Sequence, residues 1–180
     1  QLEHQYYGSY TIADRVYIYR SPVSRQEPSE SWLWHYDNHP REVLKVMVYL
    51  TDVTADTAPF EYLKARTTGR SLYGSPLAPL SVDSRIPAPT VEGLLAGEWE
   101  REAVIGPCGT VLLFDDNVVH RATAAASAHR DVVVFQVRPV AFPAKPHLDR
   151  RWTGTFRHRD IQRNPWLLGP KLRAAAKHTS

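Results

Sequence analysis

A histidine and a carboxylate lie two positions apart in the segment WHYDNHP, at His35 and Asp37, shortly before the apolar run VLKVMVYL. On an extended strand, residues two positions apart point to the same face, so this imidazole and this carboxylate can converge. They are two of the three ligands of the facial triad that holds non-haem Fe(II) with coordination positions left open. A second imidazole, from His120 in the run TVLLFDDNVVHRA, can complete the triad. The pattern therefore predicts an iron site formed by His35, Asp37 and His120.

His39 is an alternative ligand, because with His35 it forms an HxxxH pair. That spacing places two imidazoles on one face of a helix rather than a strand. Pro40 follows directly, and the residue before a proline is biased away from helical geometry. The pattern therefore favours Asp37 over His39 as the second ligand.

Two cations accompany the predicted ligands. Arg130 opens the strand-like segment RDVVVFQVRP, and a hairpin return after His120 would bring the two side by side. The planar guanidinium binds a carboxylate through two parallel hydrogen bonds, which suits an anionic co-substrate that chelates the metal. Lys45 lies inside an apolar strand, where its ammonium needs a partner, and we expect it to meet a carboxylate in the same cavity. The alternatives are a surface ion pair for Arg130 and an edge-strand charge that limits aggregation for Lys45.

Most of the chain has the residue pattern of short strands. In RVYIYR, for example, Val16 and Ile18 share one face and Tyr17 and Tyr19 the other. The expected strands are 9–23, 32–37, 43–53, 60–63, 102–105, 109–114, 118–122 and 131–137. About eight short strands with turn signals between them indicate an all-β sandwich or barrel, and a double-sheet jelly roll has a suitable strand number. One or two helical turns are expected over 90–97.

Composition indicates one globular domain over 1–180, with 43% apolar and 23% charged residues. The Pro- and Gly-rich stretch 66–89 is expected to form a long loop that covers a binding pocket. From 145 to 180, nine Lys or Arg residues face two acidic ones, which makes a basic C-terminal extension. No apolar run has the roughly 20 residues that a membrane helix needs, and the single cysteine, Cys108, fits a reducing cytoplasm.

Four segments resemble one known family. WHYD, LKVMVYLTDV, APFEYL and the pair VVHRA and HRDVVVFQVRP are similar to the phytanoyl-CoA dioxygenase-like branch of the Fe(II)/2-oxoglutarate oxygenases, over about Trp34 to Pro139. The resemblance implies a double-stranded β-helix core and hydroxylation of a C–H bond, with 2-oxoglutarate and dioxygen consumed. It implies that Arg130 grips the distal carboxylate of 2-oxoglutarate and that Lys45 lines the co-substrate site. The iron ligands it implies are His35, Asp37 and His120.

The chain departs from the family pattern at two places. The strand FEYL continues into Lys64, Ala65 and Arg66, where family members often have a Gly-Ser-His-like turn. Ala122 stands two positions after His120, where a small hydroxyl residue is often found. Neither position is a metal ligand, so the departures bear on how substrate and co-substrate are positioned.

The expected partner is a small molecule, and the basic residues of the loop and the tail suit an anionic one. Two other functions fit parts of the sequence. One is a metal-binding jelly roll that does not use 2-oxoglutarate. The other is a nucleic-acid-binding protein that uses the basic tail, although that tail lacks the regular alternation of basic and aromatic residues of a stacking platform.

Overall fold

The structure, a computed structural model, describes residues 2–37, 43–74 and 85–140. His39, the middle of the predicted loop 66–89 and the basic extension 145–180 lie outside the described residues. The helices and strands are α1 (Leu2–Tyr7), β1 (Tyr10–Ser21), the 3-10 helix η1 (Glu30–Trp32), β2 (Leu44–Tyr49), β3 (Phe60–Ala65), α2 (Ala88–Ala96), β4 (Trp99–Val104), β5 (Val111–Asp115), β6 (His120–Arg121) and β7 (Arg130–Val140).

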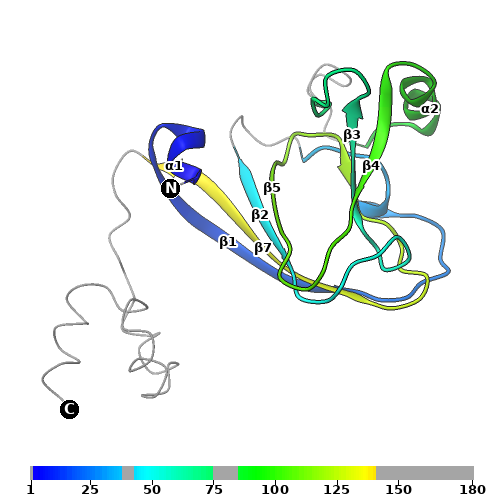
Figure 1. The fold of residues 1–180 in the computed structure, drawn as a ribbon, viewed down its shortest axis with the longest axis horizontal. Helices are drawn as coiled ribbons and strands as arrows, with labels where there is room; N and C mark the ends of the chain where they lie inside the picture. Colours follow the sequence, from blue (N-terminus) through cyan, green and yellow to red (C-terminus); the bar gives the residue numbers. More distant parts are fainter. Residues whose placement is uncertain (1, 38–42, 75–84, 141–180) are drawn as a thin grey trace, which may run out of the picture.

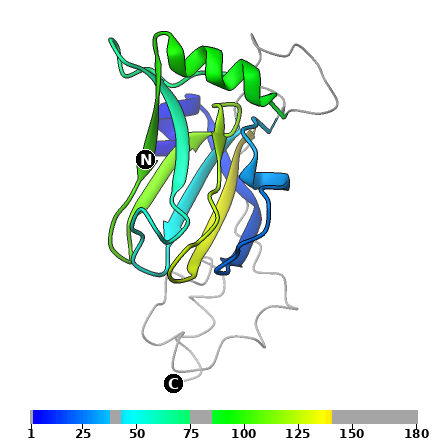
Figure 2. The ribbon, with the colours of Figure 1, turned by 90° about the vertical axis from the view of Figure 1, so that its right-hand side faces the viewer.

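Two antiparallel sheets form the body of the protein (Figure 1). The major sheet has the strand order β1-β7-β2-β5 and the minor sheet has the order β4-β3-β6. Figure 2, turned by 90° from Figure 1, shows strands of both sheets and α2 running across one end. The predicted all-β jelly roll, with few short helices, is therefore confirmed.

The longest strand pair, β1 with β7, determines what each face of the major sheet presents. Its register runs from Tyr10 opposite Val140 to Ser21 opposite Arg130, with one irregularity in between. Because side chains alternate along a strand, Tyr17 and Tyr19 line a cavity on the inner face, whereas Ile18 is 75% exposed on the outer face. The predicted alternation in RVYIYR is thus observed, and the tyrosine side is the inner one.

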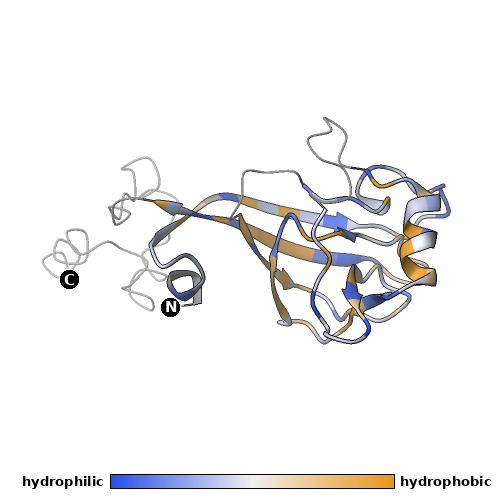
Figure 3. Ribbon diagram, turned by 90° about the horizontal axis from the view of Figure 1, so that it is seen from above, coloured by the Kyte–Doolittle hydropathy of each residue, from blue (hydrophilic) through white to orange (hydrophobic). Residues whose placement is uncertain are grey.

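The apolar core lies in two clusters on the inner side of the sheets. One cluster joins the two sheets, and its buried members are Met47, Tyr49, Val53, Phe60, Leu112, Val132 and Val134. The other lies under α2, and its buried members are Trp34, Tyr36, Leu63, Leu72, Ile86, Val91 and Val119. Figure 3 shows apolar (orange) and polar (blue) stretches alternating along the strands and α2. Burying one apolar side chain stabilises the fold by roughly 1.5–3 kcal/mol, so these clusters hold the walls of the site in place.

Several predicted elements differ from the structure. Trp32 belongs to η1 rather than to a strand, and in the expected strand 32–37 only His35 makes bridge pairs. The helix predicted from residue 90 begins at Ala88, so the loop is shorter at that end, and α1 was not predicted. In the part of the chain that the structure describes, no helix is long and apolar enough to span a membrane.

The expected hairpin between the strands of His120 and Arg130 is wrong. β6 pairs with β3 in the minor sheet, whereas β7 pairs with β1 and β2 in the major sheet. The chain crosses from one sheet to the other between these strands. The two residues nevertheless line one cavity, because the inner faces of the two sheets enclose it.

Candidate metal centre

Backbone hydrogen bonds hold the three predicted ligands next to one another. The His35 amide donates to the His120 carbonyl oxygen at 3.0 Å, and the His120 amide donates to the His35 carbonyl oxygen at 2.9 Å. The Asp37 amide donates to the carbonyl oxygen of Asp116 at 2.9 Å. His35 and Asp37 therefore lie on an extended segment that is anchored to the chain around β6 at both positions.

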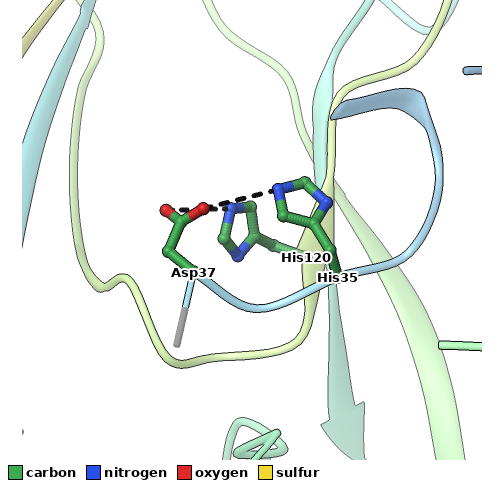
Figure 4. A group of neighbouring side chains, drawn as sticks. All are labelled: His35, Asp37 and His120. Carbon is green, nitrogen blue, oxygen red and sulfur yellow. Dashed lines mark ion pairs between the residues drawn. The ribbon is translucent and has the colours of Figure 1, made fainter. Parts of the chain in front are cut away.

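The three ligand side chains converge on one point (Figure 4). Their possible ligand atoms all lie within 4.8 Å of one another. The carboxylate oxygens of Asp37 lie 3.8 Å from Nε2 of His35 and 4.0 Å from Nε2 of His120. Two imidazole nitrogens and one carboxylate on the same side of a point form the donor set of a facial triad. The residues present therefore fit a ferrous ion.

The hydrogen bonds of the two imidazoles leave Nε2 of each ring available to bind a metal. Nδ1 of His35 lies 2.7 Å from the Leu33 carbonyl oxygen, and Nδ1 of His120 lies 2.7 Å from the Val118 carbonyl oxygen. A carbonyl oxygen only accepts hydrogen bonds, so each neutral ring carries its proton on Nδ1. The lone pair is then on Nε2, the atom that faces Asp37 in each ring. This second hydrogen bond is how proteins orient metal-binding histidines.

The charges of the site suit a divalent cation. Burial lowers the pKa of His35, and burial with the nearby His35 ring lowers the pKa of His120 to about 4. Burial acts to raise the pKa of Asp37, but the charge of Lys45 and the two imidazoles outweigh it and hold that pKa below its usual value. At neutral pH the site therefore presents two neutral imidazoles and one carboxylate, the protonation states that a metal requires.

Lys45 forms an ion pair with the carboxylate of Asp37. Its Nζ is also 3.9 Å from an oxygen of Asp116, whose side chain is fully buried. Lys45 lies on β2, between β7 and β5, so the alternative of an edge-strand charge is wrong. Lys45 instead faces the cavity and contacts the predicted metal-binding carboxylate, as its position in an apolar strand led us to expect.

Arg130, the first residue of β7, is only 1% exposed. The alternative of a surface ion pair is therefore wrong. Its Nη2 donates to the Ser21 hydroxyl at 3.2 Å, while Nε and Nη1 have no hydrogen-bond partner among the residues that the structure describes. A buried guanidinium with unused N–H donors is costly, and the cost falls when an anion binds to it.

One cavity of about 230 Å³ connects these groups. Its walls include the three predicted ligands, the two cations, and aromatic and small residues of both sheets: Tyr17, Tyr19, Ser31, His35, Asp37, Lys45, Met47, Phe60, Phe114, His120, Ala122, Arg130 and Val134. The rings of Phe60 and Phe114 pack on His120, with centroids 5.3 and 5.5 Å from that of the imidazole. These two rings also line a larger cavity of about 830 Å³, which none of the three ligands lines.

Arg121 lies outside the cavity. Its guanidinium donates to the Glu61 carboxylate at 2.7 Å and is stacked 4.6 Å from the Trp34 ring centroid. These contacts give Arg121 a structural role, away from the cavity that His120 lines. Sequence reasoning did not identify Ser21. Its position opposite Arg130 becomes visible only when the pairing of β1 with β7 is known.

Comparisons with known proteins agree with this fold. No protein-family model matches the chain. The chain is 24% identical, over 142 residues, to the L-proline trans-4-hydroxylase of Streptomyces griseoviridis, with 67% of this chain and 53% of that protein covered. Among solved structures it is similar to EctD from S. alaskensis with bound Fe, at 18% identity and a TM-score of 0.59, with 77% of this chain and 48% of that one covered.

Two further structures extend this similarity. EctD with 2-oxoglutarate and 5-hydroxyectoine has a TM-score of 0.58 at 19% identity, with 77% and 48% of the two chains covered. The non-heme alpha-ketoglutarate-dependent epimerase SnoN from nogalamycin biosynthesis has a TM-score of 0.52 at 19% identity, with 77% and 53% covered. The chain thus spans about half the length of these relatives. It has their fold, and the double-stranded β-helix that the sequence resemblance implied is confirmed.

Proposed function

We propose that this chain is an Fe(II)- and 2-oxoglutarate-dependent oxygenase of the phytanoyl-CoA dioxygenase-like kind, which hydroxylates an unactivated C–H bond of a small molecule. One observation carries the proposal: a convergent pair of histidines with a carboxylate, and a buried arginine with unused N–H donors, line the same cavity. The fold shared with EctD, which has been solved with Fe and with 2-oxoglutarate, supports the same assignment.

In this proposal His35, Asp37 and His120 hold the metal, each through the atom that faces the centre of the triad. Arg130 receives the distal carboxylate of 2-oxoglutarate through the N–H groups of its guanidinium. Lys45 adds positive charge to the same cavity. Bound iron, with 2-oxoglutarate, supplies the activation of dioxygen that oxidises the substrate and releases succinate and carbon dioxide.

The chain's own residues contribute ligand geometry and a dry cavity. Phe60 and Phe114 cover one side of His120 and exclude water from that ring. Asp37 occupies the ligand position that a halide would need, so the proposal is hydroxylation rather than halogenation. The cavity of about 230 Å³ suits a small co-substrate, and a small molecule is the substrate class we propose.

The test is an anaerobic titration of the purified protein with Fe(II) and then with 2-oxoglutarate. We expect a weak visible charge-transfer band that saturates at one equivalent of each, and succinate release that depends on dioxygen. The variants Asp37→Ala and His120→Ala should give neither signal.

Unchanged succinate release in both variants would refute the proposal. Iron binding without any effect of 2-oxoglutarate would favour the alternative, a metal-binding jelly roll that does not use this co-substrate. That alternative offers no reason for a buried guanidinium to face the metal cavity.

A further inference from the structure

At one end of the β1–β7 pair, two arginines on opposite faces of the sheet have different hydrogen-bond partners. On the outer face, Arg20 lies opposite Asp131 in the register, and its Nε and Nη2 each donate to that carboxylate at 2.8 Å. On the inner face, one position along each strand, Arg130 lies opposite Ser21. The outer arginine has an anion from the protein, whereas among the described residues the buried one is hydrogen-bonded to hydroxyl groups and to no carboxylate.

The Ser21 hydroxyl fixes the orientation of the Arg130 guanidinium. Ser21 is 8% exposed, and its hydroxyl accepts a hydrogen bond from Nη2 of Arg130 at 3.2 Å. Its backbone is paired with that of Arg130 within a twelve-residue strand, so donor and acceptor belong to one rigid unit. An arginine side chain has many rotamers, and one such bond removes most of the freedom of its planar end.

The Tyr49 hydroxyl is a second polar group beside the Arg130 guanidinium. Burial raises the pKa of Tyr49, while the charge of Arg130 and a side-chain hydrogen bond with it both act to lower that pKa. That hydroxyl already donates to the Val104 carbonyl oxygen at 2.8 Å and accepts from the Phe60 amide at 3.4 Å. Ala122, on the opposite wall of the cavity, offers no polar side-chain atom.

We infer that Ser21 is a positioning residue for co-substrate selection: it aims the Arg130 guanidinium so that the cavity prefers a 2-oxo acid with a second, distal carboxylate. The inference rests on the proposed function, because it assumes that 2-oxoglutarate binds there. A two-point hydrogen bond between a guanidinium and a carboxylate depends on the angle between their planes. Ser21 therefore acts on the distal carboxylate and leaves the 2-oxo end, which meets the metal, unaffected.

The experiment compares two ligands that differ at the distal carboxylate. Protein loaded anaerobically with Fe(II) is titrated with 2-oxoglutarate and, separately, with 2-oxobutanoate, which lacks that group. We expect Ser21→Ala to raise the dissociation constant for 2-oxoglutarate by about tenfold, the effect of one hydrogen bond to a charged group, and to change that for 2-oxobutanoate by less than twofold. Ser21→Thr, which keeps a hydroxyl, should restore most of the affinity for 2-oxoglutarate.

Two control variants complete the design. Ser9→Ala removes a hydroxyl at the opposite end of the β1–β7 pair, where it bonds the Val140 carbonyl oxygen at 3.1 Å, and should leave both affinities unchanged. In an Arg130→Met background, Ser21→Ala should have no further effect on either ligand. If Ser21→Ala fails to fold, Ser21→Cys, which keeps the volume but bonds weakly, carries the same comparison.

The possible outcomes distinguish the role of Ser21 from the proposed function of the protein. Equal affinity of Ser21→Ala and wild type for 2-oxoglutarate would overturn the role of Ser21 while leaving the proposed function intact. An equal loss for both ligands would also overturn it, since that would mark a general structural effect. Absence of 2-oxoglutarate binding to the wild-type protein would overturn the proposed function and this inference together.

Discussion

The two ends of the cavity are built in opposite ways. At the metal end, His35 lies on an isolated bridge pair and His120 on a two-residue strand, and local hydrogen bonds orient both rings. At the arginine end, Ser21 and Arg130 belong to the two longest strands of the protein's described part, paired over almost their whole length. The metal end is assembled from short segments, whereas the arginine end is part of a continuous sheet.

The ends also differ in how their charges are balanced. The Asp37 carboxylate has the ammonium of Lys45 as a partner, so the protein itself supplies a cation where the metal is proposed to bind. Arg130 has no carboxylate partner in the described ranges, so its anion must come from a ligand. Without a bound ligand, the carboxylate at the metal end is still paired with a cation, whereas the guanidinium at the arginine end is not paired with an anion. Stability and binding should therefore respond differently to mutations of Arg130 and Lys45.

The largest effect is expected from Arg130→Met, which keeps an unbranched side chain and removes the charge. We predict that the dissociation constant for 2-oxoglutarate rises on the order of 100-fold, because a two-point charged contact is lost, while Fe(II) affinity stays within twofold. The free energy of unfolding should stay the same or rise by about 1 kcal/mol, since a buried and incompletely paired charge disappears. Chemical denaturation and anaerobic titration measure these quantities, and a clear loss of stability would contradict the contrast between the ends.

The opposite stability effect is expected from Lys45→Met. This change leaves the Asp37 carboxylate, whose side chain is 22% exposed, without its ammonium partner, and should lower the free energy of unfolding by about 2 kcal/mol. Fe(II) would then supply the missing positive charge. Its addition should raise the melting temperature of the variant more than that of the wild type, and an equal rise in both proteins would argue against shared use of Asp37.

The smallest effect is a pH dependence at the metal end. Burial lowers the pKa of both imidazoles, that of His120 to about 4, whereas an exposed histidine titrates near 6.5. Below pH 6.5 the unfolded chain therefore binds more protons than the folded one, and stability should fall as the pH drops from 6.5 toward 4 and be fully present above 6.5. Denaturation across this range should show a weaker slope in His120→Gln, and a slope equal to that of the wild type would contradict this account.

Most strands, and the placement of His35 beside Asp37, could be predicted from the sequence because both depend on local patterns. Alternating apolar residues identified the strands around Val16, Val46 and Val133, and HxD spacing placed His35 beside Asp37. Each of these signals is contained in a few consecutive residues, where side-chain alternation alone decides the geometry.

The remainder depends on contacts between distant segments, which a single sequence does not display. The sheet change between β6 and β7 depends on which distant strands each of them pairs with. The pairing of Ser21 with Arg130 joins residues more than a hundred positions apart. η1 was missed because Trp32 and Trp34 look like strand residues, although Trp32 closes a helical turn from Ser29.

The most direct test of the central claim is anomalous diffraction at the iron edge, from crystals grown anaerobically with Fe(II) and 2-oxoglutarate. We predict one strong peak, about 2.0–2.2 Å from Nε2 of His35, Nε2 of His120 and a carboxylate oxygen of Asp37, with the far carboxylate of the co-substrate on Arg130. A peak bound by other residues, or no peak in crystals that diffract well, would contradict the account.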